Sequence, residues 1–173
     1  MKITFVISED IKDSLIKEIE YRVRLVFHCP IKIITGLNHL PDAYNHIRKQ
    51  YLASKFIDSI ADLSKSIDER IIRVVDFDIY SPTLDFVFGE ASSDTGAAVV
   101  SLYRLKYDGG DRYAGETVFI DRASKEIVHE LGHTLGLSHC SDLKCVMHYS
   151  QGLADTDLKD IYFCERCRPK LKL

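Results

Sequence analysis

The segment HELGHTLGLSH, residues 129–139, constrains this chain more than any other feature of its sequence. His129 and His133 are four residues apart, which on an α-helix is about 40° of rotation and about 6 Å of rise, so both imidazoles lie on one face. Two neutral imidazoles at that spacing can bind one Zn²⁺ ion at about 2.0 to 2.1 Å each. The sequence therefore predicts a metal site on a helix that runs from Asp121 to Leu135.

A third histidine and a carboxylate complete this pattern. His139 lies six residues after His133, so it cannot share the helix face and the chain must bend back. Gly136 supplies the bend, because a glycine just past a helix end adopts the left-handed conformation without a Cβ penalty. Three histidines leave the fourth tetrahedral position to a water, whose pKa the metal lowers, and Glu130 can take its proton. Glu130 is therefore predicted to be a general base and not a ligand.

Four of the five cysteines follow this motif closely. These are Cys140, Cys145, Cys164 and Cys167. They form two pairs with four and two intervening residues, which suits a closed tetrahedral Zn²⁺ site that ties the C-terminal tail to the active-site segment. Two alternatives remain open: buried free thiols, and a redox dithiol in the second pair, which no predicted strand precedes. Cys29 is expected to be a buried thiol outside this cluster.

This sequence of motifs resembles the archaemetzincin family of zinc metallopeptidases, which are metzincins: HExxHxxGxxHC, four residues, CxM and a later CxxC. The resemblance covers residues 129–167, under a quarter of the chain. It implies that Glu130 is the general base, that Met147 is the Met-turn residue, and that the four cysteines hold a second, structural zinc. The ligands that it implies for the catalytic zinc are His129, His133 and His139. It also implies a cleft between two subdomains.

Two further features resemble parts of metzincin peptidases. Tyr149, two residues after Met147, resembles a tyrosine that approaches the metal in astacin-type enzymes. Its phenol could bind zinc or stabilise an oxyanion, and a packed aromatic ring is the alternative. The stretch AAVVSLYRL, residues 97–105, resembles the edge strand that binds an extended peptide, and a plain core strand is the alternative.

Hydrophobic periodicity predicts a mixed α/β (α+β) fold. The strands that it predicts are 2–8, 31–35, 71–80, 84–88, 97–105 and 117–120, and the helices are 10–27, 41–67, 121–135 and 156–167. The resemblance to archaemetzincins implies a metzincin-like zincin fold, with a mixed sheet and an active-site helix. It forms one domain, residues 1–173, with an N-terminal subdomain to about residue 136 and a C-terminal subdomain from about 137 that contains the Met-turn and the four cysteines.

Composition limits the remaining classes of function. The chain has 173 residues and a net charge of −3, which argues against a nucleic-acid or membrane-surface partner. The sequence has no recognisable export signal or membrane span, so a cytoplasmic location is expected.

We predict a zinc metallopeptidase with two Zn²⁺ ions, one catalytic and one structural, that hydrolyses peptide or protein substrates by a zinc-bound water. The alternative is a non-catalytic zinc-binding interaction protein. The oligomeric state is not predicted.

Overall fold

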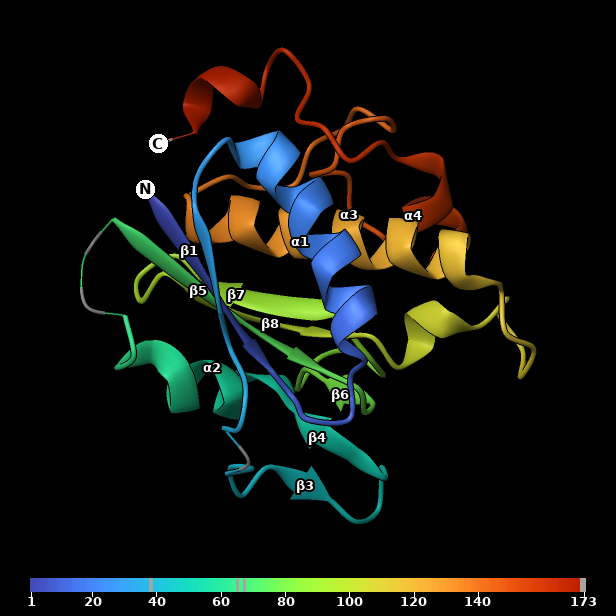
Figure 1. The fold of residues 1–173 in the computed structure, drawn as a ribbon. Coiled ribbons are helices and arrows are strands. Elements are labelled where there is room, and N and C mark those ends of the chain that lie inside the picture. The colour runs from blue at the N-terminus through green and yellow to red at the C-terminus, as the bar shows by residue number, and fades with distance from the viewer. Residues whose placement is uncertain (38, 65, 67, 172–173) are drawn as a thin grey trace.

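A five-stranded mixed sheet forms the centre of the protein (Figure 1). The computed structural model describes residues 1–37, 39–64, 66 and 68–171. The strands in spatial order are β2 (Ile31–Ile34), β1 (Lys2–Ile7), β5 (Glu69–Val75), β8 (Ala97–Ser101) and β7 (Gly89–Ser92). The first four are parallel to one another, and β7 pairs antiparallel with β8. An antiparallel strand thus ends this sheet beside the longest helix.

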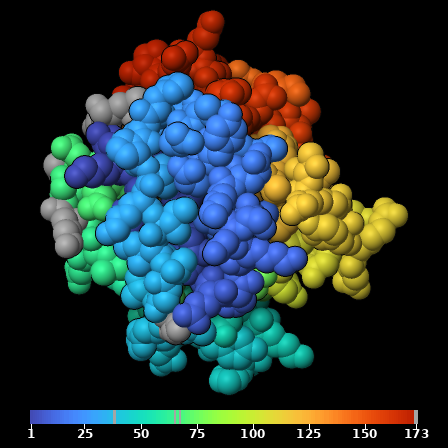
Figure 2. Space-filling model, in the orientation of Figure 1, coloured from blue at the N-terminus to red at the C-terminus, as the bar shows by residue number. Residues whose placement is uncertain are grey.

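Helices cover both faces of the sheet because its strands are apolar on both sides. Alternate residues of β1 face opposite ways: Ile3 and Phe5 join the core under α1 (Asp13–Phe27) and α3 (Glu116–Thr134), whereas Val6 joins the core under α2 (Ala53–Ala61). Figures 1 and 2 show α1, in blue, over the viewer's face of the molecule. The predicted mixed α/β fold is confirmed, and it places the HExxH helix, α3, between the sheet and the C-terminal segment.

The predicted helix over 41–67 is wrong in its first half. The chain instead forms a second small sheet of β3 (Tyr44–Asn45), β4 (Gln50–Leu52) and β6 (Ile79–Tyr80), and α2 begins only at Ala53. Tyr44 pairs with Tyr51 across the β3–β4 hairpin, and their rings lie 4.8 Å apart. Cross-strand aromatic contacts of this kind outweigh a weak helical pattern. Residues 65 and 67, at the end of the predicted helix, lie outside the described residues.

Four other predicted elements need correction. The predicted strand 71–80 is divided between β5 (Glu69–Val75) in the large sheet and β6 (Ile79–Tyr80) in the small one. Residues 84–88 form a turn and an irregular segment, because side chains from the hairpin region bind its carbonyls: Arg48 donates to Leu84 O and Asp85 O. Residues 117–120, predicted as a strand, form the first turn of α3. The tail has only a short helix, α4 (Leu153–Leu158), before a loop and a 3₁₀ turn, η2 (Arg168–Lys170), in place of the predicted helix over 156–167.

The stretch 97–105 is not an edge strand. Its first part, β8, lies between β5 and β7 and is buried along its whole length, and its last residues enter a 3₁₀ turn, η1 (Arg104–Lys106). The open edge beside α3 therefore belongs to β7. In the part of the chain that the structure describes, no helix is long and apolar enough to cross a membrane.

Candidate active site

The end of α3 turns the chain back toward the helix through a hydrogen-bonded cap. The Leu137 amide donates to Gly132 O at 3.1 Å, and the Gly136 amide donates to His133 O at 2.9 Å. Gly136 has a φ of +87°, a left-handed conformation that suits glycine at this position. The chain that leaves this cap carries His139 back to the helix face.

The three histidines meet at one point. Nε2 of His133 lies 3.1 Å from Nε2 of His129 and 3.3 Å from Nε2 of His139. One nitrogen from each of the three rings lies within 4.8 Å of the others. Tetrahedral zinc with Zn–N bonds of about 2.05 Å requires ligand nitrogens about 3.3 Å apart. The rings are therefore spaced as ligands of one ion.

Hydrogen bonds on the far side of two rings fix which nitrogen faces this point. Nδ1 of His129 lies 2.7 Å from Val146 O, and Nδ1 of His133 lies 2.7 Å from Leu137 O. A carbonyl oxygen only accepts, so each Nδ1 carries the proton and each Nε2 presents a lone pair. Burial lowers the pKa of both rings and keeps them neutral. Two lone pairs 3.1 Å apart repel unless a cation lies between them, so this donor set fits zinc.

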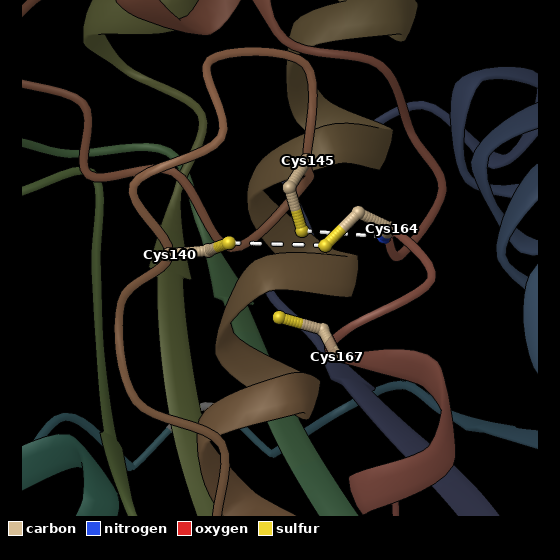
Figure 3. A group of neighbouring side chains, drawn as sticks. All are labelled: Cys140, Cys145, Cys164 and Cys167. Atoms are coloured by element: carbon tan, nitrogen blue, oxygen red, sulfur yellow. Dashed lines mark hydrogen bonds between the residues drawn. The ribbon is translucent and has the colours of Figure 1, made fainter.

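The four cysteines form a second group (Figure 3). Their sulfur atoms lie within 4.8 Å of one another, and Sγ of Cys140 is 3.8 Å from Sγ of Cys164. Zn–S bonds of about 2.3 Å imply sulfurs about 3.8 Å apart. Burial raises the pKa of Cys164, but amide donors from Cys167 and Arg166 and the neighbouring thiols outweigh it and lower that pKa to about 7. Such a cluster suits a tetrahedral metal ion better than a disulfide.

Backbone contacts connect the two groups. The Cys140 amide donates to Met147 O at 2.8 Å, and Val146, whose carbonyl binds His129, directly follows Cys145. Met147 is fully buried against α3, where a Cβ on Gly132 would lie 2.4 Å from its sulfur. The small residue at 132 therefore allows this segment to pack closely beneath the three-histidine group.

Glu130 is buried beside the histidines. It is 5% exposed, and no hydrogen bond from a described residue reaches its carboxylate. A Cβ on Gly89 of β7 would lie 2.5 Å from Cγ of Glu130, so the edge strand packs directly against this side chain. Burial raises the pKa of Glu130 well above its ordinary value, the neighbouring Glu126 and Glu90 carboxylates raise it further, and Lys159 lowers it. These surroundings favour the protonated form of the carboxyl group, as expected for a group that accepts a proton.

A cleft of about 790 Å³ opens over the histidines and Glu130. The 84–91 segment lines one wall, and residues 136–139 and 149–151 line the other. Tyr149 lines the cleft with its ring 4.8 Å from the ring of His139, and it is 39% exposed. The residues that the sequence assigned to the three-histidine site all line this cleft except Met147, which packs against Gly132 of α3.

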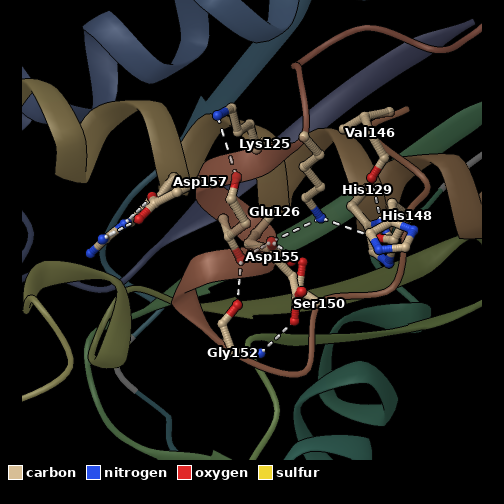
Figure 4. Close-up of polar contacts among 12 residues, drawn as sticks. Lys125, Glu126, His129, Val146, His148, Ser150, Gly152, Asp155 and Asp157 are labelled. Atoms are coloured by element: carbon tan, nitrogen blue, oxygen red, sulfur yellow. Dashed lines mark hydrogen bonds and ion pairs between the residues drawn. The ribbon is translucent and has the colours of Figure 1, made fainter. Parts of the chain in front are cut away.

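The sequence analysis missed a buried ion pair in the cleft wall. Nζ of Lys159 lies 3.0 Å from Oε1 of Glu126, and both side chains are almost fully buried. Figure 4 shows the polar contacts around Glu126, which accepts hydrogen bonds from Ser150 Oγ and Thr156 Oγ1. Glu126 lies three residues before His129 on the same helix, which is the signal that could have identified it. Nothing in the sequence indicates its pairing with a lysine 33 residues away.

Comparison with known proteins identifies the family. The model of peptidase family M54 matches residues 2–173. The chain belongs to this family. M54 relatives named archaemetzincin include one from Pyrococcus horikoshii, 39% identical over 82% of this chain and 77% of its own length. Another, from Methanocaldococcus jannaschii, is 34% identical over 94% of this chain and 88% of its own length. Membership in M54 makes the chain a zinc metallopeptidase.

Solved structures of the same kind have the same fold. A zinc-dependent peptidase from Methanocorpusculum labreanum superposes with a TM-score of 0.88 at 29% identity, covering 98% of this chain and 100% of that one. An archaemetzincin from Archaeoglobus fulgidus, complexed with malonate, superposes with a TM-score of 0.82 at 30% identity, covering 99% and 100%. The resemblance and the fold class that the sequence predicted are therefore both confirmed.

Proposed function

We propose that this M54 chain hydrolyses peptide bonds in the cleft, with His129, His133 and His139 as the zinc ligands and Glu130 as the general base. The observation that carries the proposal is the pair of Nε2 lone pairs 3.1 Å apart, fixed by the carbonyls of Val146 and Leu137, next to a buried carboxylate. When bound there, zinc would act as a Lewis acid on the substrate carbonyl and lower the pKa of water.

Glu130 then performs the proton transfers. It takes a proton from the attacking water and delivers it to the nitrogen of the leaving amine. Its raised pKa suits this exchange, because a strongly acidic carboxylate would not accept the proton. Met147, buried against Gly132 of α3, would be the Met-turn residue. Tyr149, beside His139 at the cleft, is placed to bind the metal or to donate a hydrogen bond to the oxyanion.

The substrate would lie along β7. This strand is at the sheet edge, and its residues Gly89, Glu90 and Ala91 line the cleft. An edge strand offers unpaired backbone groups to an extended peptide, which gives affinity for the main chain of many sequences. We therefore assign to β7 the role of binding an extended peptide, which the sequence suggests for residues 97–105.

The second zinc would be structural and held by the four cysteines. Together they join the segment after His139 to the C-terminal tail, which supports the proposed division into subdomains near residue 136. A closed thiolate site contributes metal-binding energy to folding. Elemental analysis of the purified chain should give two zinc ions per chain, and one zinc would reject this model. The cytoplasmic location stays a prediction.

A peptide library tests the proposal against the non-catalytic alternative. The zinc-loaded chain, incubated with peptides of diverse sequence, should produce fragments with new amino termini that mass spectrometry detects. Removing the metal with a chelator should stop the cleavage, and adding zinc should restore it. A folded, zinc-loaded chain that cleaves no peptide would favour a zinc-binding interaction protein.

A further inference from the structure

We propose that Glu126 is a substrate-binding group in the cleft, which recognises a positively charged amine or guanidinium of the peptide, and that Lys159 holds it in place. This inference rests on the proposed peptidase function. The reaction outlined above uses neither residue, although burying an ion pair beside an active site is costly unless further bonds compensate it.

The contacts of Glu126 occupy one side of its carboxylate. Oε1 faces Lys159 Nζ at 3.0 Å and accepts from Thr156 Oγ1 at 3.0 Å and Ser150 Oγ at 3.4 Å. Among the described residues, no hydrogen bond reaches Oε2. A carboxylate has about four lone-pair sites on two oxygens, so this buried group keeps acceptor capacity. Because Glu126 also lines the cleft, a substrate is the partner that can use it.

Lys159 fixes the carboxylate from behind. It comes from the segment after α4, is fully buried, and has a second contact to His148 O at 3.5 Å. The contact with the buried ammonium holds Oε1 in place, and no described residue donates a hydrogen bond to Oε2. Lys159 is thus a positioning residue: it acts on the substrate through Glu126.

The acidic side chains of the cleft favour a cationic ligand. Asp85, Glu90, Glu126 and Glu130 line it, and its described lining residues include no lysine or arginine. Glu126 lies three residues before His129, which is about 4.5 Å along the helix axis, and an extended peptide advances about 3.3 Å per residue. The recognised group therefore belongs to a residue within about two positions of the cleaved bond.

Matched peptides provide the test. Starting from a peptide that the chain cleaves, lysine or its uncharged near-isostere methionine is placed at each position within two residues of the cleaved bond. Each peptide is made with a free and with an acetylated amino terminus. Hydrolysis is measured with the zinc-loaded chain, and binding by fluorescence anisotropy with the Glu130→Gln variant. At one position, lysine should be preferred about ten- to a hundredfold in both measurements, the range expected of a charge-assisted hydrogen bond.

Two variants separate a direct contact from the general charge of the cleft. Glu126→Gln leaves Lys159 buried without its partner and can fail to fold. The double variant Glu126→Gln/Lys159→Met removes one charge of each sign and keeps the net charge, so a preference caused only by the field of the cleft would survive in it. Asp157→Asn is the control, because Asp157 binds Arg122 and joins α4 to α3 without lining the cleft.

We expect the double variant to reduce the lysine preference to within about threefold and Asp157→Asn to keep it. A preference for free over acetylated termini that disappears in the double variant would assign the same site to the terminal amine and would also support the proposal. A wild-type chain without a preference for either cation, or a double variant that keeps the preference, would overturn it. If no peptide is cleaved, the proposed hydrolysis is wrong. The binding measurement then still tests whether Glu126 recognises a cationic group.

Discussion

Replacing Gly89 with alanine tests how closely the edge strand approaches Glu130. The added methyl would lie 2.5 Å from Cγ and 2.7 Å from Oε1 of Glu130, whereas ordinary contacts begin at 3.4 Å. The carboxylate or the strand must therefore move by about 0.9 Å, the difference between 3.4 and 2.5 Å. A displacement of about 1 Å at a reacting group can cost about 10²-fold in rate. We expect kcat/KM for a cleaved peptide to fall by about two orders of magnitude.

The same substitution should leave the metal in place, because the nearest atoms to the methyl all belong to Glu130. Zinc content, thermal melting and peptide hydrolysis are measured on one sample. Gly110→Ala is the control, since a Cβ there meets its nearest neighbour, Oδ1 of Asp108, at an ordinary 3.7 Å. An unchanged rate in Gly89→Ala, or an equal loss in Gly110→Ala, would refute the close packing of β7 on Glu130.

Three further predictions concern the metal groups. Cys164→Ser should lower Tm more than Cys29→Ser, because it opens the four-thiolate site; equal melting would argue against a metal there. Stepwise chelation should abolish hydrolysis before the circular dichroism signal changes, because the three-histidine site keeps an open coordination position, and simultaneous loss would contradict two separate sites. Burial lowers the pKa of His129, His133 and His139, so below about pH 6.5 the unfolded chain binds protons that the metal-free folded chain does not. The urea concentration at the unfolding midpoint of the metal-free chain should therefore decrease as the pH is lowered from 7.5 to 5.5. A midpoint that does not change with pH would contradict this reasoning.

The three-histidine cluster could be predicted from sequence because most of its geometry is local. Two histidines four residues apart share a helix face whatever the fold, and Gly136 marks the helix end by its conformational freedom. The sequence predicts that α3 begins at Asp121, five residues after its observed start at Glu116. Val118, Phe119 and Ile120 have the composition of a strand, but in the structure they lie at the start of the helix, where Phe119 and Ile120 pack against the core.

Other features depend on contacts between distant segments. Residues 84–88 have a strand-like composition, yet Arg48 and Gln50 bind their carbonyls, which removes the need for a sheet partner. The Glu126–Lys159 pair is of the same kind, because a single sequence does not show which buried charges meet. The edge position of β7 likewise follows from strand order, which the apolar pattern of residues 97–101 does not determine.

The central claim is that Glu130 acts as a base at a zinc ion held by three histidines. Zinc content and peptide hydrolysis, measured on the same preparation of Glu130→Gln, test it most directly. We predict two zinc ions per chain, as in the unaltered protein, and a rate reduced by about 10² to 10⁴, because the substitution removes a base and no ligand. An unchanged rate, or the loss of one zinc together with the activity, would contradict the role that we assign to Glu130.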